Sequence, residues 1–328
     1  EDLFDKNTLL VLNFISELNY ESVMFFFVLS GFSIGLSLKE KTAFTKPDIN
    51  NYLFRRLRRI LPIYILALIV PIIFGFISNT LHQEEYSLIN LLGNILFLQT
   101  LPSVIDSWFT PYGLNDPLWS ISYEMFFYLI FPILLFLNNQ YLKSTNVYIK
   151  YGLLYIVALL AITFNKSILF IPYSLFLWGF TTWVLGYLTA LFYLRKRYYH
   201  MFFVILLGFG ITVQVLKNSI PSYSIVYGSV GIIIGCIFYF SVVFIKKNPL
   251  PILSSIINFI FYKIGKGSYA IYALHYPILI FLSNKEVSLF LQTILLIPFI
   301  VICCYIESKS LDFKLSFLKL DYMRCKNK

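Results

Sequence analysis

Uncharged apolar stretches of membrane length dominate this chain. The stretch Leu118–Leu137 carries a single charged residue, Glu124. A helix needs about 20 apolar residues to cross the hydrocarbon core of a bilayer. Because lipid offers no hydrogen-bond partners, a spanning segment must satisfy its own backbone. The sequence therefore predicts an all-α fold, a polytopic transmembrane helical bundle.

The composition supports this prediction. Hydrophobic residues make up 59% of the chain and charged residues only 13%, whereas soluble domains carry roughly 25% charge. No stretch of the chain is long enough for a separate soluble domain without containing a membrane-length apolar segment. We therefore predict a single membrane domain over residues 1–328.

Reading the uncharged stretches as spans predicts nine transmembrane helices. They are Ser22–Leu38, Ile60–Ile77, Leu118–Leu137, Tyr151–Asn165, Ser167–Leu194, Met201–Leu216, Asn218–Ile245, Gly267–Asn284 and Val287–Ile306. Two further apolar segments are shorter and are predicted to be interfacial or re-entrant helices. These segments are Leu88–Leu101 and Ile252–Tyr262.

The distribution of basic residues predicts the orientation. Of the 26 lysines and arginines, all but Lys6, Lys166, Lys217 and Lys285 fall on one side of the nine spans. Short cytoplasmic loops are enriched in these residues, so that side and the C-terminus are predicted to be cytoplasmic. The net charge of +10 is then explained by topology, and no nucleic-acid partner is predicted.

With nine spans, the N-terminus would lie outside the cell. The region Glu1–Tyr20 is too polar to span a membrane or to act as a signal peptide. We therefore expect at least one further helix upstream, which gives ten spans with both ends inside.

An arginine cluster, Arg55-Arg56-Leu57-Arg58-Arg59, precedes the second predicted span. One interpretation is a membrane anchor whose arginines reach lipid phosphates. The other is that Arg56 and Arg59, three residues apart on one helix face, bind the phosphates of a cofactor from the cytoplasm. The absence of lysine from the cluster favours planar, bidentate phosphate recognition.

Glu124 lies roughly 9 Å into the outer half of its predicted span, at about 1.5 Å per residue from Leu118. An ionisable group at such a depth is costly, so it is a candidate functional residue. It is either a structural carboxylate bonded to a neighbouring helix, or a general acid/base or an orienter of a catalytic histidine. Ser120, four residues earlier, shares its helix face and is expected to be able to hydrogen-bond it.

Other candidates have weaker signals. His275 is the only histidine inside a predicted span, and Pro277 frees backbone acceptors that it could satisfy. Ser30 lies mid-span, but no base is identifiable beside it in the sequence. Gly31 and Gly35 beside it form a small-residue packing face. The cysteines show no metal-ligand spacing, so no metal is predicted. Neither a phosphate-binding loop nor a dinucleotide fingerprint is present, so a nucleotide-containing cofactor is expected to be held by other means.

Four segments together resemble the membrane acyltransferase-3 family, whose members O-acylate bacterial surface carbohydrates. They occur in the family's order and cover most of the chain. The segments are Phe25-Phe26-Phe27-Val28-Leu29-Ser30-Gly31-Phe32, Arg56-x-x-Arg59-x-x-Pro62, Pro117-Leu118-Trp119-Ser120 through Glu124-x-x-Phe127-Tyr128, and Gly267-Ser268-Tyr269 through His275-x-Pro277.

The resemblance implies a ten-helix enzyme of the bacterial inner membrane. It would transfer an acyl group, most often acetyl, from cytoplasmic acyl-CoA to a hydroxyl of an envelope saccharide. Arg56 and Arg59 would hold the CoA phosphates, and Glu124 would tune or replace a histidine that family members carry on a first helix not found in this chain. Residues predicted to line the acyl or substrate path are Ser30, His275, Trp119, Ser120 and Tyr272.

Two alternatives remain at this point. One is a non-enzymatic transporter or flippase of lipid-linked saccharides, in which Glu124 and His275 relay protons. The other is an inactive family member that serves as a scaffold in the cell envelope. The first explains the ionisable residues but not the arginine cluster.

Overall fold

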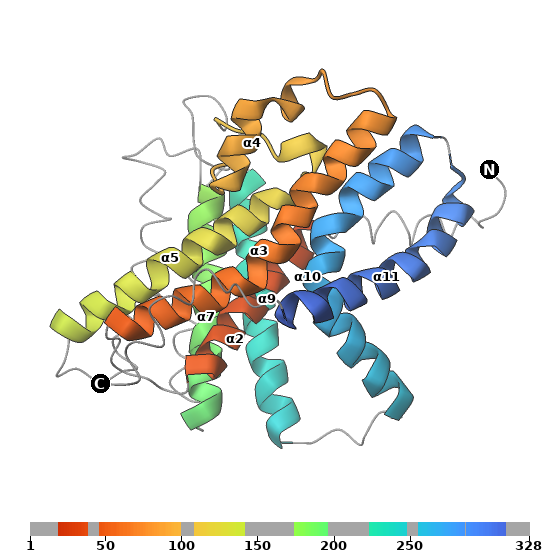
Figure 1. The fold of residues 1–328 in the computed structure, drawn as a ribbon. Helices are drawn as coiled ribbons and strands as arrows, with labels where there is room; N and C mark the ends of the chain where they lie inside the picture. Colours follow the sequence, from red (N-terminus) through yellow and green to blue (C-terminus); the bar gives the residue numbers. More distant parts are fainter. Residues whose placement is uncertain are drawn as a thin grey trace. The chain divides into compact units, whose positions relative to one another are not determined.

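The structure, a computed structural model, describes residues 19–38, 46–99, 108–141, 174–195, 223–247, 255–285 and 287–312. Within these ranges the secondary structure is entirely helical (Figure 1). The longer elements are α2 (Asn19–Leu38), α3 (Lys46–Ile77), α5 (Leu118–Tyr141), α7 (Ser174–Arg195), α9 (Tyr223–Lys247), α10 (Ser255–Asn284) and α11 (Leu289–Asp312). The short ones are η1 (Glu84–Tyr86), α4 (Leu88–Ile95) and η2 (Tyr112–Leu114).

The membrane character of the chain is supported by these helices. Three described stretches are long and apolar enough to cross a bilayer, namely Glu21–Leu38, Asp48–Ile77 and Leu118–Phe136. Two shorter apolar helical stretches are Gly179–Leu194 and Val230–Phe244. The predicted spans Tyr151–Asn165 and Met201–Leu216, and the first residues of Ser167–Leu194 and Asn218–Ile245, lie outside the described residues. The total of nine spans therefore stays a prediction.

Several predicted boundaries differ from the structure. The segment Ile252–Tyr262 was expected to be a separate interfacial helix, but from Ser255 it continues into α10. Lysine is a good helix former, so Lys263 and Lys266 mark a charged stretch of this helix and do not end it. Likewise α3 begins at Lys46, well before the predicted start of the span.

The predicted interfacial segment Leu88–Leu101 is helical only as far as Ile95. The chain then reverses through Phe97, whose φ of 59° lies in the left-handed region. Ser87 caps the start of the helix, because its side chain accepts a hydrogen bond from the Asn90 N–H.

The chain divides into two compact units, each built from two sequence segments. Unit 1 comprises Glu1–Thr45 and Tyr123–Pro251, and unit 2 comprises Lys46–Ser122 and Ile252–Lys328. The described helices of unit 1 are α2, most of α5, α7 and α9. Those of unit 2 are α3, α4, α10 and α11, with η1, η2 and the first turn of α5.

In unit 1, α2 packs closely against α7 and α9. A Cβ added at Gly31 would lie 1.9 Å from the carbonyl oxygen of Trp183, and one at Gly186 would lie 2.0 Å from that of Val28. Only glycine permits this approach, so the predicted packing role of Gly31 is confirmed. The close crossing also fixes where the Trp183 side chain lies relative to α2.

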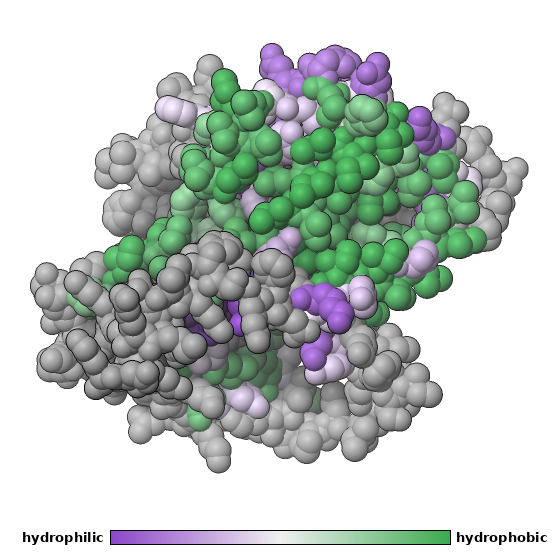
Figure 2. Space-filling model, viewed as in Figure 1, coloured by the Kyte–Doolittle hydropathy of each residue, from purple (hydrophilic) through white to green (hydrophobic). Residues whose placement is uncertain are grey.

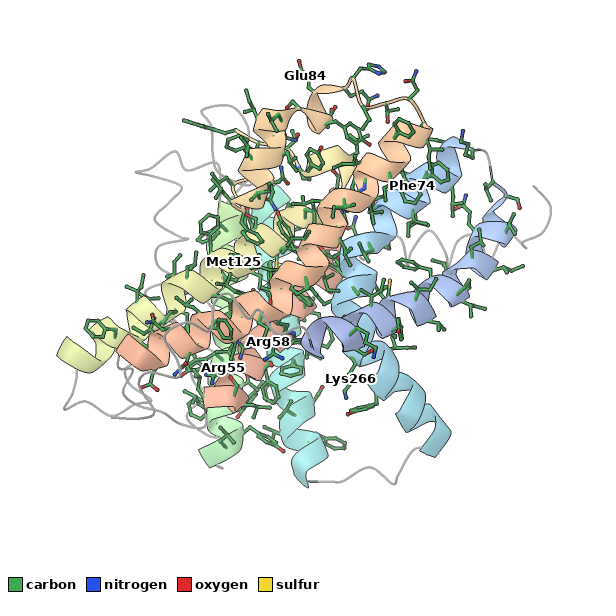
Figure 3. All side chains as sticks on the ribbon, in the orientation of Figure 1. Arg55, Arg58, Phe74, Glu84, Met125 and Lys266 are labelled. Atoms are coloured by element: carbon green, nitrogen blue, oxygen red, sulfur yellow. The ribbon has the colours of Figure 1, made fainter. Side chains whose placement is uncertain are left out.

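In unit 2, α3 packs against α10, α11 and η2. Figure 3 shows Arg55 and Arg58 towards one end of α3 and Glu84 beyond its other end. Figure 2 shows hydrophilic side chains over the η1 loop and hydrophobic ones along the helices. Large apolar side chains stay exposed on one face of α3, at Ile65, Ile69, Ile73 and Phe76. An exposed apolar face of this length suits contact with lipid acyl chains.

Candidate functional site

Helix α5 carries Glu124 into the interior of unit 1. Glu124 is only 3% exposed. Figure 3 labels Met125, the next residue along the helix. The Ser30 hydroxyl donates to Glu124 Oε1 at 2.6 Å. The Tyr128 hydroxyl, one turn further along α5, donates to the same oxygen. The buried carboxyl group therefore accepts hydrogen bonds from two hydroxyl groups.

Ser30, on α2, is held by three partners from two other helices, α5 and α7. Besides Glu124, its oxygen lies 2.8 Å from the Tyr128 hydroxyl and accepts a hydrogen bond from Trp183 Nε1 at 3.1 Å. No base beside Ser30 could be identified from the sequence. The structure provides one, because Glu124 is 94 residues away in the chain but in direct hydrogen-bond contact.

Aromatic side chains surround this group, which we call the carboxylate cluster (Ser30, Glu124, Tyr128 and Trp183). Phe131 packs edge-on to Trp183 at a centroid distance of 4.8 Å. Phe27 of α2 packs against Phe127 of α5 at 5.2 Å, and Tyr187 of α7 packs against Phe131 of α5 at 4.7 Å. The aromatic rings and the 3% exposure of Glu124 place its carboxyl group in a largely apolar surrounding.

Two members of the carboxylate cluster were missed as site residues. Tyr128 stands four residues after Glu124, so helical periodicity alone places it on the same face. Trp183 gave no signal in the sequence, because its contact with Ser30 depends on the crossing of α2 and α7. Only a tertiary structure reveals such a contact.

In unit 2, Ser120 does not make the predicted bond to Glu124. Its hydroxyl donates to the Pro117 carbonyl at 3.1 Å and lies 2.7 Å from the Tyr272 hydroxyl. Tyr272 also donates to the Pro117 carbonyl at 3.2 Å. Ser120 lies in the first turn of α5, where a backbone acceptor and a partner from α10 are nearer. Two residues predicted to line the substrate path, Ser120 and Tyr272, are thus in direct contact, and Trp119 beside them is half-buried.

His275 is half-buried in α10. Its Nδ1 lies 2.7 Å from the Tyr272 carbonyl oxygen, which can only accept, so Nδ1 carries the hydrogen. In the neutral ring Nε2 is then the acceptor nitrogen. The rings of Tyr272 and Tyr276 flank the imidazole at 5.9 Å and 6.2 Å.

The Ala273 carbonyl, which Pro277 leaves without an N–H donor, accepts a hydrogen bond from Asn115. The sequence did not predict this role of Asn115. Pro277 has no N–H for Ala273, and Pro71 in α3 has none for Ala67. The Asn115 Nδ2 group donates to both carbonyl oxygens, at 3.0 Å for Ala273 and 3.2 Å for Ala67. Asn115 is fully buried. One amide group therefore ties two proline-interrupted helices together.

The arginine cluster lies on α3, as predicted, but Arg56 and Arg59 differ in environment. Arg56 is 8% exposed and its guanidinium lies 5.7 Å from the centre of the Tyr52 ring. Arg59 is exposed and interacts electrostatically with Glu307. Glu307 is itself buried and accepts a hydrogen bond from the Ala270 N–H at 2.9 Å. Of this pair, Arg59 is the more accessible to a soluble anion.

Metal binding has no support in the part of the chain that the structure describes, where no three His, Cys, Asp or Glu side chains come together. Cys236, Cys303 and Cys304 are present as free thiols.

Comparison with known proteins gives one family. The model of the acyltransferase-3 family, described as an acyltransferase domain, matches residues 3–307. No curated protein and no solved structure matches the chain.

Proposed function

The chain belongs to the acyltransferase-3 family and is a membrane acyltransferase, and on that premise we propose that it acylates an envelope saccharide. The donor in this proposal is a cytoplasmic acyl-CoA, with acetyl as the group carried, and the acceptor is a sugar hydroxyl. The observation that supports it best is the buried Glu124 with its two hydroxyl partners. Acyl transfer to a hydroxyl requires removal of a proton, and a carboxylate within hydrogen-bond reach can remove it.

Glu124 is the proposed general acid/base. Its hydrogen bond to Ser30 measures 2.6 Å, inside the range of about 2.6–3.2 Å expected of a general base and the proton that it takes. Because Glu124 and its partners belong to apolar helices of membrane length, the proposed reaction occurs at membrane depth.

Arg59 and Arg56 are the proposed donor site. A guanidinium group matches phosphate oxygens in a bidentate geometry and stays charged at all physiological pH values. The exposed Arg59 would contact the CoA phosphates, and the buried Arg56 would add to the local positive potential. This assignment requires that the arginine end of α3 and the C-terminus face the cytoplasm of a bacterial cell, as the charge pattern predicts.

The residues around Tyr272 are the proposed acceptor path. Trp119, Ser120, Tyr272 and His275 present aromatic faces, hydroxyl groups and an imidazole within unit 2. Aromatic faces and hydrogen-bonding side chains are the groups that commonly bind sugars in proteins.

Transfer of label tests the proposed reaction. Membranes containing the full-length protein would be incubated with acetyl-CoA labelled in the acetyl group and with crude envelope carbohydrate. We expect label on the carbohydrate, and membranes without the protein serve as the control. Absence of label from the carbohydrate, with a competent acceptor present, would refute the proposed acyl transfer. It would leave the alternative of an inactive scaffold. The family assignment already favours the enzyme over a transporter.

The donor site has a matched pair of variants. Arg55 and Arg59 are both exposed arginines of the same cluster. We expect Arg59→Ala to weaken CoA binding about tenfold, which corresponds to about 1.4 kcal/mol, and Arg55→Ala to weaken it less. Binding would be measured by isothermal titration with CoA in detergent, at low and high salt. Equal affinity in the wild type and both variants would mean that the cluster is only a membrane anchor.

A further inference from the structure

Ser30 has the surroundings of a nucleophile. It lies near the middle of α2, and its hydroxyl hydrogen points to Glu124 Oε1 at 2.6 Å. A serine oxygen has two lone pairs. Trp183 Nε1 donates to one of them at 3.1 Å, and the Tyr128 hydroxyl lies 2.8 Å from the same oxygen. With the Tyr128 hydrogen donated to Glu124 Oε1, the second lone pair is available for attack on a carbonyl carbon. A serine activated by an adjacent base, with the base held by a third group, is the usual signature of nucleophilic catalysis.

Ser30 is more exposed than Glu124, as nucleophilic catalysis requires. Ser30 is half-buried, whereas Glu124 is only 3% exposed. The nucleophile can therefore be reached by a substrate while the base is shielded from water. The Tyr128 hydroxyl contacts both residues, so the carboxyl group keeps its orientation through this second donor when the Ser30 proton is removed.

We propose that Ser30 carries the acyl group as a covalent ester between donor and acceptor. This inference rests on the acyl transfer proposed above. A donor from one side of the membrane and an acceptor from the other would have to meet at one point in a direct transfer. A carrier near the middle of a membrane-length helix lets the two substrates react one after the other.

The proposed transfer has two half-reactions, acylation of Ser30 and deacylation by the saccharide, and Glu124 ends each one in the state in which it began. In the first, Ser30 Oγ attacks the carbonyl carbon of the acyl thioester and its proton passes to Glu124. The carbon–sulfur bond breaks, and Glu124 returns the proton to the thiolate, which leaves as CoA thiol. In the second, a saccharide hydroxyl attacks the acyl-Ser30 carbonyl carbon and gives its proton to Glu124. The ester bond to Ser30 breaks, and the proton returns to Oγ. The Trp183 N–H stabilises negative charge on Oγ as it leaves.

Trapping of the acyl-enzyme tests the proposal. The full-length protein would be mixed with labelled acetyl-CoA without acceptor, quenched in acid within a single turnover, digested and analysed by mass spectrometry. We expect the acetyl mass on the peptide that contains Ser30, and its loss from that peptide when envelope saccharide is added before quenching. Ser30→Ala is expected to lower transfer to saccharide by at least about a hundredfold.

Two further variants separate chemistry from folding. Ser37 lies on the same helix, where its hydroxyl donates to the Ile34 carbonyl at 2.9 Å, so Ser37→Ala is the matched control and is expected to transfer at the wild-type rate. Ser30→Cys keeps a nucleophile and is expected to form a thioester that neutral hydroxylamine cleaves. A structural role for Ser30 predicts no such adduct.

The outcomes also separate this proposal from the proposed function. Label on saccharide with none on Ser30 within the first turnover, and wild-type transfer by Ser30→Ala, would each overturn the covalent carrier while the acyltransferase activity stands. Label on Ser30 that no saccharide accepts would support the carrier and refute the proposed acceptor. Absence of label from both would refute the two proposals together.

Discussion

Units 1 and 2 each bury a group of polar side chains, but these groups bond to different partners. In the carboxylate cluster of unit 1, Glu124 bonds to the side-chain hydroxyls of Ser30 and Tyr128. In unit 2, Asn115 bonds to two backbone carbonyls that prolines have left without an N–H donor. The first group contains exchangeable protons beside a carboxyl group, and the second contains an amide that neither gains nor loses a proton. Burial alone therefore does not identify a functional residue; the bonding partners do.

Glu124→Gln tests the difference between the two polar groups, and we expect it to have the largest effect, on the rate of acyl transfer. Glutamine has the same shape and still accepts hydrogen bonds from both hydroxyls, but it cannot take up a proton. We expect transfer of labelled acetyl to fall by about 10²–10⁴, with little change in thermal unfolding in detergent. Glu84→Gln, at an exposed position of η1, is the control. Near-normal transfer would make the carboxylate cluster structural, like the group around Asn115.

Asn115→Ala is expected to act on stability. The carbonyls of Ala67 and Ala273 would lose their donor inside the protein, which costs about 1–3 kcal/mol of unfolding free energy. Combining it with Pro277→Ala restores a backbone N–H for Ala273, so the double variant should lose less stability than Asn115→Ala alone. Unfolding in detergent followed by circular dichroism measures this double-mutant cycle. Equal losses for the single and double variants would contradict the assigned role of Asn115.

Ser120→Ala is expected to have the smallest effect, because Tyr272 keeps its bond to the Pro117 carbonyl. The loss of the hydrogen bond between the Ser120 and Tyr272 hydroxyls lowers the free energy of unfolding by about 0.5–1.5 kcal/mol. If Ser120 and Tyr272 line the acceptor path, the variant should also raise KM for the saccharide without changing kcat. Initial rates at varied saccharide concentration separate the two parameters, and Tyr272→Phe is the companion variant. An unchanged KM would assign the pair to packing alone.

The sequence predicted the family, the all-helical class and the position of Glu124 on a membrane-length helix. The family is confirmed by the match over residues 3–307, and the helical class is confirmed in the described ranges. Both depend on local signals, namely apolar stretches and short motifs. Helical periodicity is local too, and it correctly placed Arg56 and Arg59 on one helix.

The partners of the site residues could not be predicted in this way. Ser30 and Glu124 are 94 residues apart, and their contact depends on how three helices pack. Ser120 was predicted to bond Glu124 because four residues separate them, yet Tyr272 from α10 provides a nearer hydroxyl. Asn115 gave no signal by itself, because its role depends on prolines in two other helices. Arg56 and Arg59 differ in burial although they lie on one helix, a difference that their spacing in the sequence does not predict.

The bond from Trp183 to Ser30 turns the indole into an optical probe of the serine. Indole fluorescence depends on the acceptor of its N–H, and esterification would convert the hydroxyl oxygen, now 3.1 Å away, into an ester oxygen. The chain has four tryptophans, and replacing Trp108, Trp119 and Trp178 by phenylalanine would leave this one as the sole indole. Loading and unloading of the carrier would then be visible in real time, in the light emitted by a residue that the protein already contains.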